Sequence, residues 1–221
     1  MPSWNRGRIP SVPRVRGSEV ELVKVRTWPL LIALASVLLV LGACGTPPTY
    51  LEEIAAWRAE KDDFMRRSGD SPVPAENRAA FPPLPYYPAD EQYRVPAALK
   101  LAQGDEIIEL GTSTGVPRRM RRVGTLAFTL KGEPLTLTAF GDLDDPQLRR
   151  LFVPFGDLTS GSETYHGGRY LDLERTASGV YDLDFNRAYN PFCVFDVKYE
   201  CPVPPRENRM KIPVRAGEKM P

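Results

Sequence analysis

Two cysteines near the C-terminus are the residues whose types and spacing first suggest chemistry. Cys193 and Cys201 lie in the stretch DFNRAYNPFCVFDVKYECPVPPREN, residues 184–208, which is rich in proline and asparagine and has no helical period. In an exported chain a disulfide is permissible, and closing a loop of about nine residues contributes roughly 2.5 kcal/mol in the chain-entropy model. A metal pair lacks the further ligands of a tetrahedral site, and a reactive thiol lacks a local base. We therefore predict a Cys193–Cys201 disulfide.

Other polar groups give weaker signals. His166, the single histidine, stands beside two glycines, which suits a surface turn better than general acid–base catalysis. The aspartates of residues 142–145 resemble half of a calcium loop, but no spaced acidic partner follows them. The arginines of residues 118–122 could contact anionic headgroups, although charge also protects a strand edge from pairing. We expect a solvated turn, a charged strand edge, no metal site and no cofactor.

The N-terminal residues have the features of an export signal. A basic flank precedes an apolar run over residues 28–41, which is short for a membrane span, and Gly-Ala-Cys follows and ends at Cys44. This order resembles the lipobox of bacterial lipoproteins, in which the cysteine carries the lipid. The sequence predicts a lipoprotein signal peptide over residues 1–43, with Val23 as a possible true start, and lipidation at Cys44. A short transmembrane anchor is the alternative.

Charge and export together limit the partners. The chain has a net charge of +1, but residues 1–43 hold six Lys/Arg against two Glu, so the remainder is slightly acidic. An acidic domain is unsuited to binding the phosphates of nucleic acid, which needs a basic face. We expect a lipid-anchored protein on the exported side of a bacterial cell-envelope membrane. Its partners would be that membrane, through Cys44, and an envelope ligand or protein, with no nucleic acid.

Beyond a tether over residues 44–49, the pattern predicts a single domain over residues 50–221. Thr49 and Glu52 form a capping box at the start of an amphipathic helix over 50–68, and a Pro- and aromatic-rich segment over 70–92 follows. We interpret that segment as wrapping around the domain, with a polyproline ligand for another protein as the alternative. Turn residues then recur every eight to twelve positions, which is typical of antiparallel structure. The candidate strands are residues 94–101, 106–112, 116–122, 126–130, 135–139, 148–155, 168–174, 179–185 and 210–215. The predicted fold class is mainly β, a small antiparallel sandwich or barrel with one N-terminal amphipathic helix.

Several blocks of sequence resemble a known family. They are WRAEKDDFM (57–65), YYPADEQYRV (86–95), FVPFGDLTSGSETYHGGRYLDL (152–173), the 184–208 stretch and AGEK (216–219). With these blocks the chain resembles the uncharacterised bacterial family catalogued as domain of unknown function 1684, for which the resemblance implies no activity. It does imply a candidate binding or catalytic set, in which a small residue usually replaces His166. The set is Asp157, Glu163, Tyr165, Arg169, Asp184, Asn186, Asn190, Glu207, Asn208, Glu218 and Lys219, besides both cysteines.

Three hypotheses for function follow. The leading one is a non-catalytic binding module for an envelope component or small ligand, with Tyr165, Arg169, Asp184 and Asn186 lining a polar pocket. The first alternative is an envelope hydrolase that uses a carboxylate pair such as Glu163 and Asp184, of which one needs a raised pKa. The second is a structural interaction protein, in which Asp and Asn satisfy turn amides and arginines pair with buried carboxylates.

Overall fold

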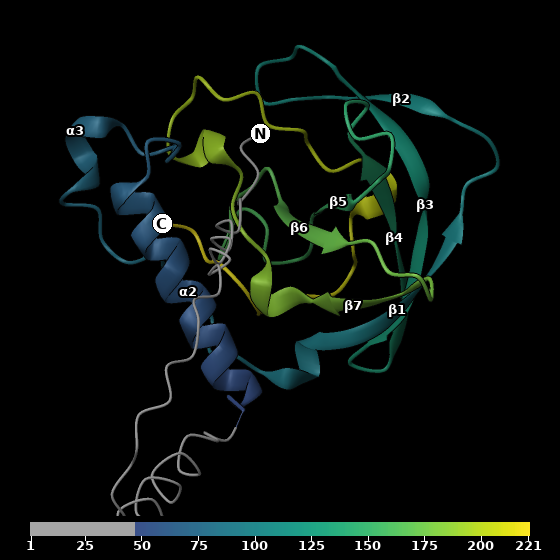
Figure 1. Ribbon diagram of the computed structural model, residues 1–221, viewed down its shortest axis with the longest axis horizontal. Helices are drawn as coiled ribbons and strands as arrows, with labels where there is room; N and C mark the ends of the chain where they lie inside the picture. The colour runs from purple at the N-terminus through teal and green to yellow at the C-terminus, as the bar shows by residue number, and fades with distance from the viewer. Residues whose placement is uncertain (1–46) are drawn as a thin grey trace, which may run out of the picture. The chain divides into compact units, whose positions relative to one another are not determined.

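A single antiparallel sheet, curled into a nearly closed barrel, forms the centre of the protein (Figure 1). The computed structural model describes residues 47–221, and residues 48–221 form one compact unit. The predicted fold class, mainly β with an N-terminal helix, is confirmed. The strands are β1 (Arg94–Leu101), β2 (Ile107–Leu110), β3 (Arg118–Leu130), β4 (Glu133–Gly141), β5 (Arg150–Phe155), β6 (Arg169–Glu174) and β7 (Val180–Asp184).

The strand order shows how the barrel nearly closes. The strand order in the sheet is β6-β5-β4-β3-β1-β7. Strand β2 pairs with the N-terminal part of β3. The chain that leaves β7 returns to β6, where Tyr189 and Tyr170 form an isolated antiparallel bridge. Curling turns one face of the sheet inward, and the residues on that face, among them Leu126, Leu137 and Leu183, are fully buried. This inner face supplies the main hydrophobic core.

The hairpin of β3 and β4 confirms the predicted alternation. Leu126 pairs with Leu137 and Phe128 with Leu135, and the buried side chains share one face. The turn consists of Lys131 and Gly132, which both have positive φ, as a tight two-residue hairpin requires. The two strands expected at 116–122 and 126–130 are one strand, β3, because a bulge between Arg122 and Gly124 bends the strand without ending it.

The N-terminal helix packs against the barrel through a narrow stripe. Helix α2 (Tyr50–Arg67) starts with the expected capping box, in which Thr49 and Glu52 satisfy each other's backbone N–H groups. Its buried residues are Ile54, Lys61 and Met65. Leu51, which the apolar pattern of the helix places on the buried side, is 52% exposed. Lys61, a polar residue in the same helix, is buried.

The segment after α2 lies on the domain as an irregular arm. It contains one helical turn, α3 (Ala75–Arg78), and a 3-10 turn, η1 (Glu91–Tyr93). Leu84 and Tyr87 are buried, and backbone bonds of Pro85 and Tyr87 to Lys219 and Gly217 form a short antiparallel bridge, so both side chains and backbone anchor the arm. The last segment of the chain, which Figure 1 shows beside α2, also differs from expectation. Residues 210–215 form no strand, because backbone bonds join only Met210 to Gly156 and Ile212 to Leu158 without a continuous ladder, and a side chain, that of Arg169, bonds the carbonyl of Val214.

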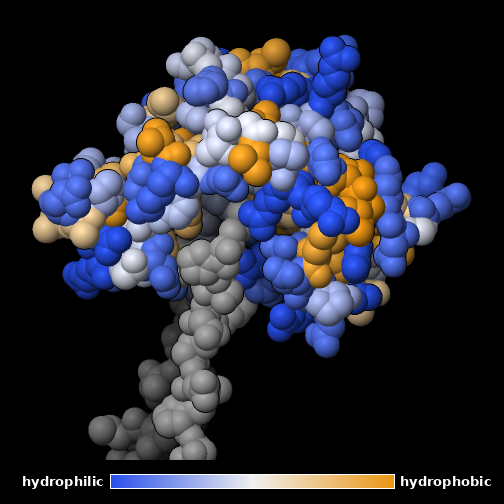
Figure 2. All heavy atoms as spheres, turned by 90° about the horizontal axis from the view of Figure 1, so that it is seen from above, coloured by the Kyte–Doolittle hydropathy of each residue, from blue (hydrophilic) through white to orange (hydrophobic). Residues whose placement is uncertain are grey.

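The described surface carries separate apolar patches on a mostly hydrophilic face (Figure 2). The exposed large apolar side chains come from several distant segments: Leu51, Leu101, Ile107, Val116, Leu158, Val180, Val197 and Met220. Within residues 47–221, none of the helices has the length and apolar character needed to cross a membrane.

The close approach of β1 to the bulge in β3 generates a test. A Cβ at Gly124 would lie 2.3 Å from the carbonyl oxygen of Lys100 and 2.9 Å from Cα of Leu101, both backbone atoms that cannot turn away. We expect Gly124→Ala to lower the free energy of unfolding by about 1–3 kcal/mol. Chemical denaturation of the purified protein measures this. Gly111→Ala is the control, since nothing lies within 4 Å of its Cβ position. Equal stability of the two variants would contradict the β1–β3 packing described here.

Candidate functional site

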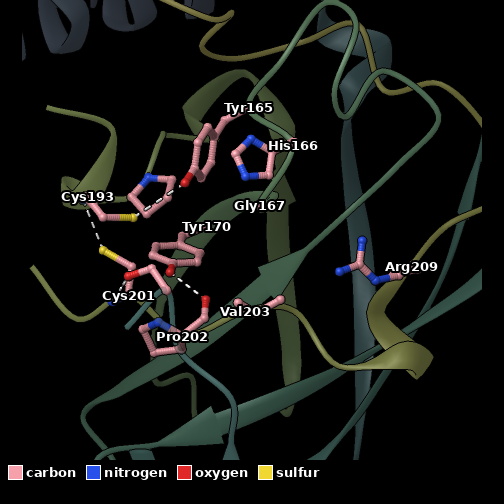
Figure 3. A pocket seen from close by; sticks show the side chains of 11 residues that line it. Tyr165, His166, Gly167, Tyr170, Cys193, Cys201, Pro202, Val203 and Arg209 are labelled. Atoms are coloured by element: carbon pink, nitrogen blue, oxygen red, sulfur yellow. Dashed lines mark hydrogen bonds between the residues drawn. The ribbon is translucent and has the colours of Figure 1, made fainter. Parts of the chain in front are cut away.

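A pocket beside the two cysteines is the concave site with the most reactive side chains. It has a volume of about 240 Å³ and lies where the β5–β6 connection, the 184–208 stretch and Ser113 meet. Figure 3 shows the two sulfur atoms near the rings of Tyr165 and Tyr170, with Arg209 at a distance from them. The lining residues are Ser113, Tyr165, His166, Gly167, Tyr170, Pro191, Cys193, Cys201, Pro202, Val203 and Arg209.

The two cysteines are neighbours in space, but they are free in this structure rather than joined in the expected disulfide. The backbone N–H of Cys193 donates to Sγ of Cys201 at 3.1 Å. A short 3-10 turn, η3 (Phe192–Val194), sets this geometry, because it carries Cys193 back over the chain that arrives at Cys201. Cys201 is buried, whereas Cys193 is only partly so. Both cysteines line the pocket, and the thiol of Cys193 is the more accessible of the two.

Hydrogen bonding makes the accessible thiol acidic. Donation from the Cys201 thiol, with the Tyr165 hydroxyl nearby, lowers the pKa of Cys193 to about 6. The same thiol–thiol interaction, with burial, raises the pKa of Cys201. The hydroxyl of Tyr165 lies 3.9 Å from Sγ of Cys193. The lowered pKa of Cys193 and the raised pKa of Cys201 favour a thiolate on Cys193 and a proton on Cys201.

The remaining pocket walls are rigid. Ser113 accepts the backbone N–H of Cys201 at 3.1 Å and donates to the carbonyl of Tyr199 at 3.1 Å. The hydroxyl of Tyr170 donates to the carbonyl of Pro202 at 2.6 Å. His166 is exposed and its ring stacks on that of Tyr165, with 4.3 Å between centroids. It lines the pocket mouth without a bond to either thiol in the part of the chain described.

Arg169 belongs to a buried network away from this pocket. Its guanidinium, 1% exposed, pairs with Asp157 at 2.9 Å and donates to the carbonyls of Val214, Ala216 and Glu218. The Asp157 carboxylate also accepts the backbone N–H groups of Thr159 and Val214 and the Thr159 hydroxyl. One ion pair therefore holds the C-terminal segment against the start of β6.

Glu218 and Asn190 continue this network to helix α2. The Glu218 carboxylate pairs with the buried ammonium of Lys61 and accepts the backbone N–H of Asn190 at 2.7 Å. The Asn190 side chain donates to the carbonyl of Lys219 at 2.8 Å. Lys61 explains the polar interruption in the helical apolar pattern, because it reaches across to the C-terminal segment. Lys219 itself is exposed, with its ammonium over the ring of Tyr87.

Asp184 and Asn186 join three segments in the same way. Asp184 ends β7 and caps the 3-10 turn η2 (Phe185–Arg187) by accepting the N–H of Asn186. It also accepts the hydroxyl of Tyr50 at 2.9 Å, which ties down the start of α2. The Asn186 amide bonds both the N–H and the carbonyl of Asp90. These groups are used in cross-links and do not line the pocket with Tyr165.

Asn208 fills a gap in the sheet. Strands β4 and β5 share only the Phe140–Phe152 register pair, and Pro154 has no N–H to donate. The Asn208 amide, fully buried, accepts the N–H of Thr138 at 2.7 Å and donates to the carbonyls of Thr138 and Pro154. It acts as one rung of a strand ladder. Its neighbour Glu207 is exposed and forms an ion pair with Arg122, with 3.5 Å between the carboxylate oxygen and the guanidinium nitrogen.

Glu163 and Asp184 show no arrangement for hydrolysis. Glu163 forms a bidentate pair with Arg215 and accepts the hydroxyl of Tyr87, a set of partners that Asp184 does not share. The hydrogen bonds from Arg215 lower the pKa of Glu163, whereas a general acid at neutral pH needs a raised one. Neither carboxylate lines the pocket. The structure gives no support to this pair as acid and base.

The other charged groups are on the surface. Arg118 pairs with Asp142, and Arg149 pairs with Asp145, so two of the three aspartates of residues 142–145 are bound to arginines. Arg121 and Arg122 face acidic residues of the segment that precedes β2. Over residues 47–221, no cluster of three His, Cys, Asp or Glu residues could hold a metal ion.

Sequence reasoning identified part of the pocket and missed the rest. It singled out Tyr165 and both cysteines, and it weighed His166. It missed Ser113 and Arg209, because each reaches the pocket from a segment with no distinctive pattern of its own. It also missed Lys61 as a network residue, for which the interrupted apolar stripe was the available signal.

Comparison with known proteins places this fold in a family. None of the curated proteins matches the chain. The chain is similar to an uncharacterized protein of Haloarcula marismortui, whose solution NMR structure is 39% identical in sequence and has a TM-score of 0.60. That match covers 76% of this chain and 92% of the other. Residues 79–219 match the family described as "Protein of unknown function (DUF1684)". The chain is therefore a member of the DUF1684 family, as its sequence blocks indicated.

Proposed function

We propose that this protein is a lipid-anchored binding module of the cell envelope that takes a small ligand into the pocket beside Cys193 and Cys201. One observation carries the proposal. The pocket brings two thiols, three hydroxyls, an imidazole and a guanidinium to one cavity, in a domain where other distinctive polar side chains are used in internal bonds. Convergent polar groups in a small cavity are the usual mark of a ligand site.

The rigidity of the walls supports binding in a fixed geometry. Asn190 and Glu218 fix the chain just before Pro191, and the bonds of Ser113 fix the chain at Cys201. A site whose walls are already ordered loses little conformational entropy when a ligand binds. The volume of about 240 Å³ suits a ligand, or part of one, of several heavy atoms.

Membrane attachment through Cys44 is a proposal from sequence, because Cys44 lies outside the described residues. The basic flank, the apolar run and the small residues before Cys44 support it. Two or more acyl chains, each contributing about 0.8 kcal/mol per buried methylene, would hold the domain at the membrane surface. In that exported setting a disulfide between Cys193 and Cys201 is also permissible, and the adjacent thiols support it.

Ligand binding is tested by filling the pocket. Native mass spectrometry of the full chain, extracted from envelopes in mild detergent, should show a retained small molecule. We expect Val203→Trp, which places a large side chain on the pocket wall, to lose that mass. Val197→Trp is the matched control, since Val197 is 87% exposed and lies off the pocket. A wild-type protein that carries nothing, or equal retention by both variants, would refute the proposed function.

Lipidation has a direct readout. When cells are grown with labelled palmitate, the wild-type chain and Cys193→Ser should incorporate label, and Cys44→Ser should not. Cys193→Ser is the control for removing a cysteine as such. Label retained by Cys44→Ser would show that the anchor is attached elsewhere.

The architectural role of the buried network predicts a stability difference. Arg169→Met leaves the buried Asp157 carboxylate without its cation and three carbonyls without a donor. Removing one partner of a buried pair is expected to lower the free energy of unfolding by about 3–5 kcal/mol. Thermal unfolding should show a large drop in Tm, while Arg215→Met, which removes the exposed partner of Glu163, changes Tm little. Comparable small shifts in both would assign Arg169 a role other than structure.

A further inference from the structure

We infer that Cys193 and Cys201 form a thiol–disulfide exchange site that reacts with small, anionic disulfides entering the pocket. This inference rests on the proposed function for the existence of a ligand site, and it names the ligand's chemical class. The geometry contains the parts that such a site needs: an accessible attacking thiol, a buried resolving thiol next to it, and a cavity that admits a ligand to the first of them.

The exposure of the two thiols assigns their roles. Both cysteines line the pocket, but Cys193 is the more exposed, so its sulfur is the one that an entering disulfide meets first. Cys201 is 6% exposed, and its sulfur lies 3.1 Å from the backbone nitrogen of Cys193. A thiol in that position is shielded from solvent. It can still reach the Sγ atom of Cys193 when that atom is part of a mixed disulfide. Cys193 is therefore the nucleophile and Cys201 the resolving residue.

Hydrogen-bond donors around Cys193 stabilise its thiolate. Hydrogen bonding from the thiol of Cys201, with the Tyr165 hydroxyl 3.9 Å from its sulfur, lowers the pKa of Cys193 to about 6. The thiolate is the reactive form in exchange, and a thiol with a pKa somewhat below ambient pH is ionised while remaining a good nucleophile. The raised pKa of Cys201 keeps that thiol protonated as a donor until exchange begins.

The chemistry balances without any further reagent. The Cys193 thiolate attacks one sulfur of the disulfide RS–SR, forms a mixed disulfide Cys193–S–SR and expels the first RS⁻. Cys201 then gives up its proton and attacks the Cys193 sulfur, which forms the Cys193–Cys201 disulfide and expels the second RS⁻. Both leaving groups take up protons. The protein loses two electrons, and the small disulfide gains them as two thiols.

The pocket's charge and size indicate the kind of disulfide. Arg209 is the only cationic side chain among the lining residues, and no acidic residue lines the pocket. Figure 3 shows its guanidinium apart from the two sulfur atoms, so a ligand with a carboxylate several atoms from its sulfur could reach both. The volume of about 240 Å³ favours a low-molecular-weight thiol over a folded protein substrate.

The test uses the full-length, reduced protein in detergent with glutathione disulfide as the probe. Intact mass spectrometry should show that the wild type becomes two hydrogens lighter as two glutathione thiols appear. Cys201→Ser keeps a hydroxyl donor beside Cys193, so it should accumulate one mixed disulfide with glutathione. Cys193→Ser should react with glutathione disulfide at least tenfold more slowly than Cys201→Ser does. If Cys201→Ser captures no glutathione, or if Cys193→Ser reacts as fast as Cys201→Ser, the inference is overturned.

Two further measurements separate reactivity from simple exposure. In the reduced wild type, the rate at which iodoacetamide alkylates Cys193, followed by peptide mass mapping, should rise with a midpoint near pH 6, because the thiolate forms above the lowered pKa. Arg209→Gln should slow the reaction with glutathione disulfide at least threefold, while cystamine, a cationic disulfide, reacts no more slowly. A midpoint at pH 8 or above overturns the assignment of Cys193, and equal effects on both probes overturn the preference for an anion.

Failure of this inference is distinguishable from failure of the proposed function. A retained ligand that Val203→Trp displaces, combined with no exchange at Cys193, leaves a binding module with unreactive thiols. Exchange at Cys193 in a protein that retains no ligand shows a redox site without the proposed binding role.

Discussion

The buried guanidinium of Arg169 is the contact on which the rest of the structure depends. It stands at the start of β6 and neutralises Asp157, and it donates to three carbonyls of a C-terminal segment that has no strand of its own. Arginine suits this place because its planar fork offers several donors while it stays charged. The segment it fixes presents Glu218 to Lys61, and through that second buried pair helix α2 is held on the barrel.

The same principle explains the density of Asp and Asn in the second half of the chain. Side-chain amides and carboxylates replace ladder bonds wherever the sheet is incomplete: Asn208 between β4 and β5, Asn186 at the arm, and Asn190 next to the C-terminus. Buried backbone groups must be paired, and the irregular segments described here pair with one another only in isolated bridges. Side chains that bond backbone groups on two segments supply the missing partners. These side chains are therefore used to hold the fold together. The pocket remains as the place for chemistry.

The pocket is a product of this bracing. The chain between Asn190 and Cys201 has one 3-10 turn and little other regular structure, yet bonds near both of its ends fix it. That constraint brings an accessible and a buried thiol together and places the Tyr165 hydroxyl next to the first. Such an arrangement gives the cysteines an asymmetry that a purely structural staple does not need. It is the physical basis for assigning them opposite roles in exchange.

The sequence by itself determined the family, the antiparallel class, the capped helix and most strands, because these follow from local patterns: apolar alternation in 126–130 and 135–139, and the Thr49–Glu52 cap. It also brought out Asp157, Arg169, Asn208 and Glu218, without showing that they are buried cross-links. Tertiary structure alone decided that Lys61 reaches Glu218, that residues 210–215 form no strand, and that Ser113 and Arg209 join the cysteines. The physical reason is that each of these contacts spans distant segments, and a side chain's partner across such a gap is set by the packing of the whole barrel.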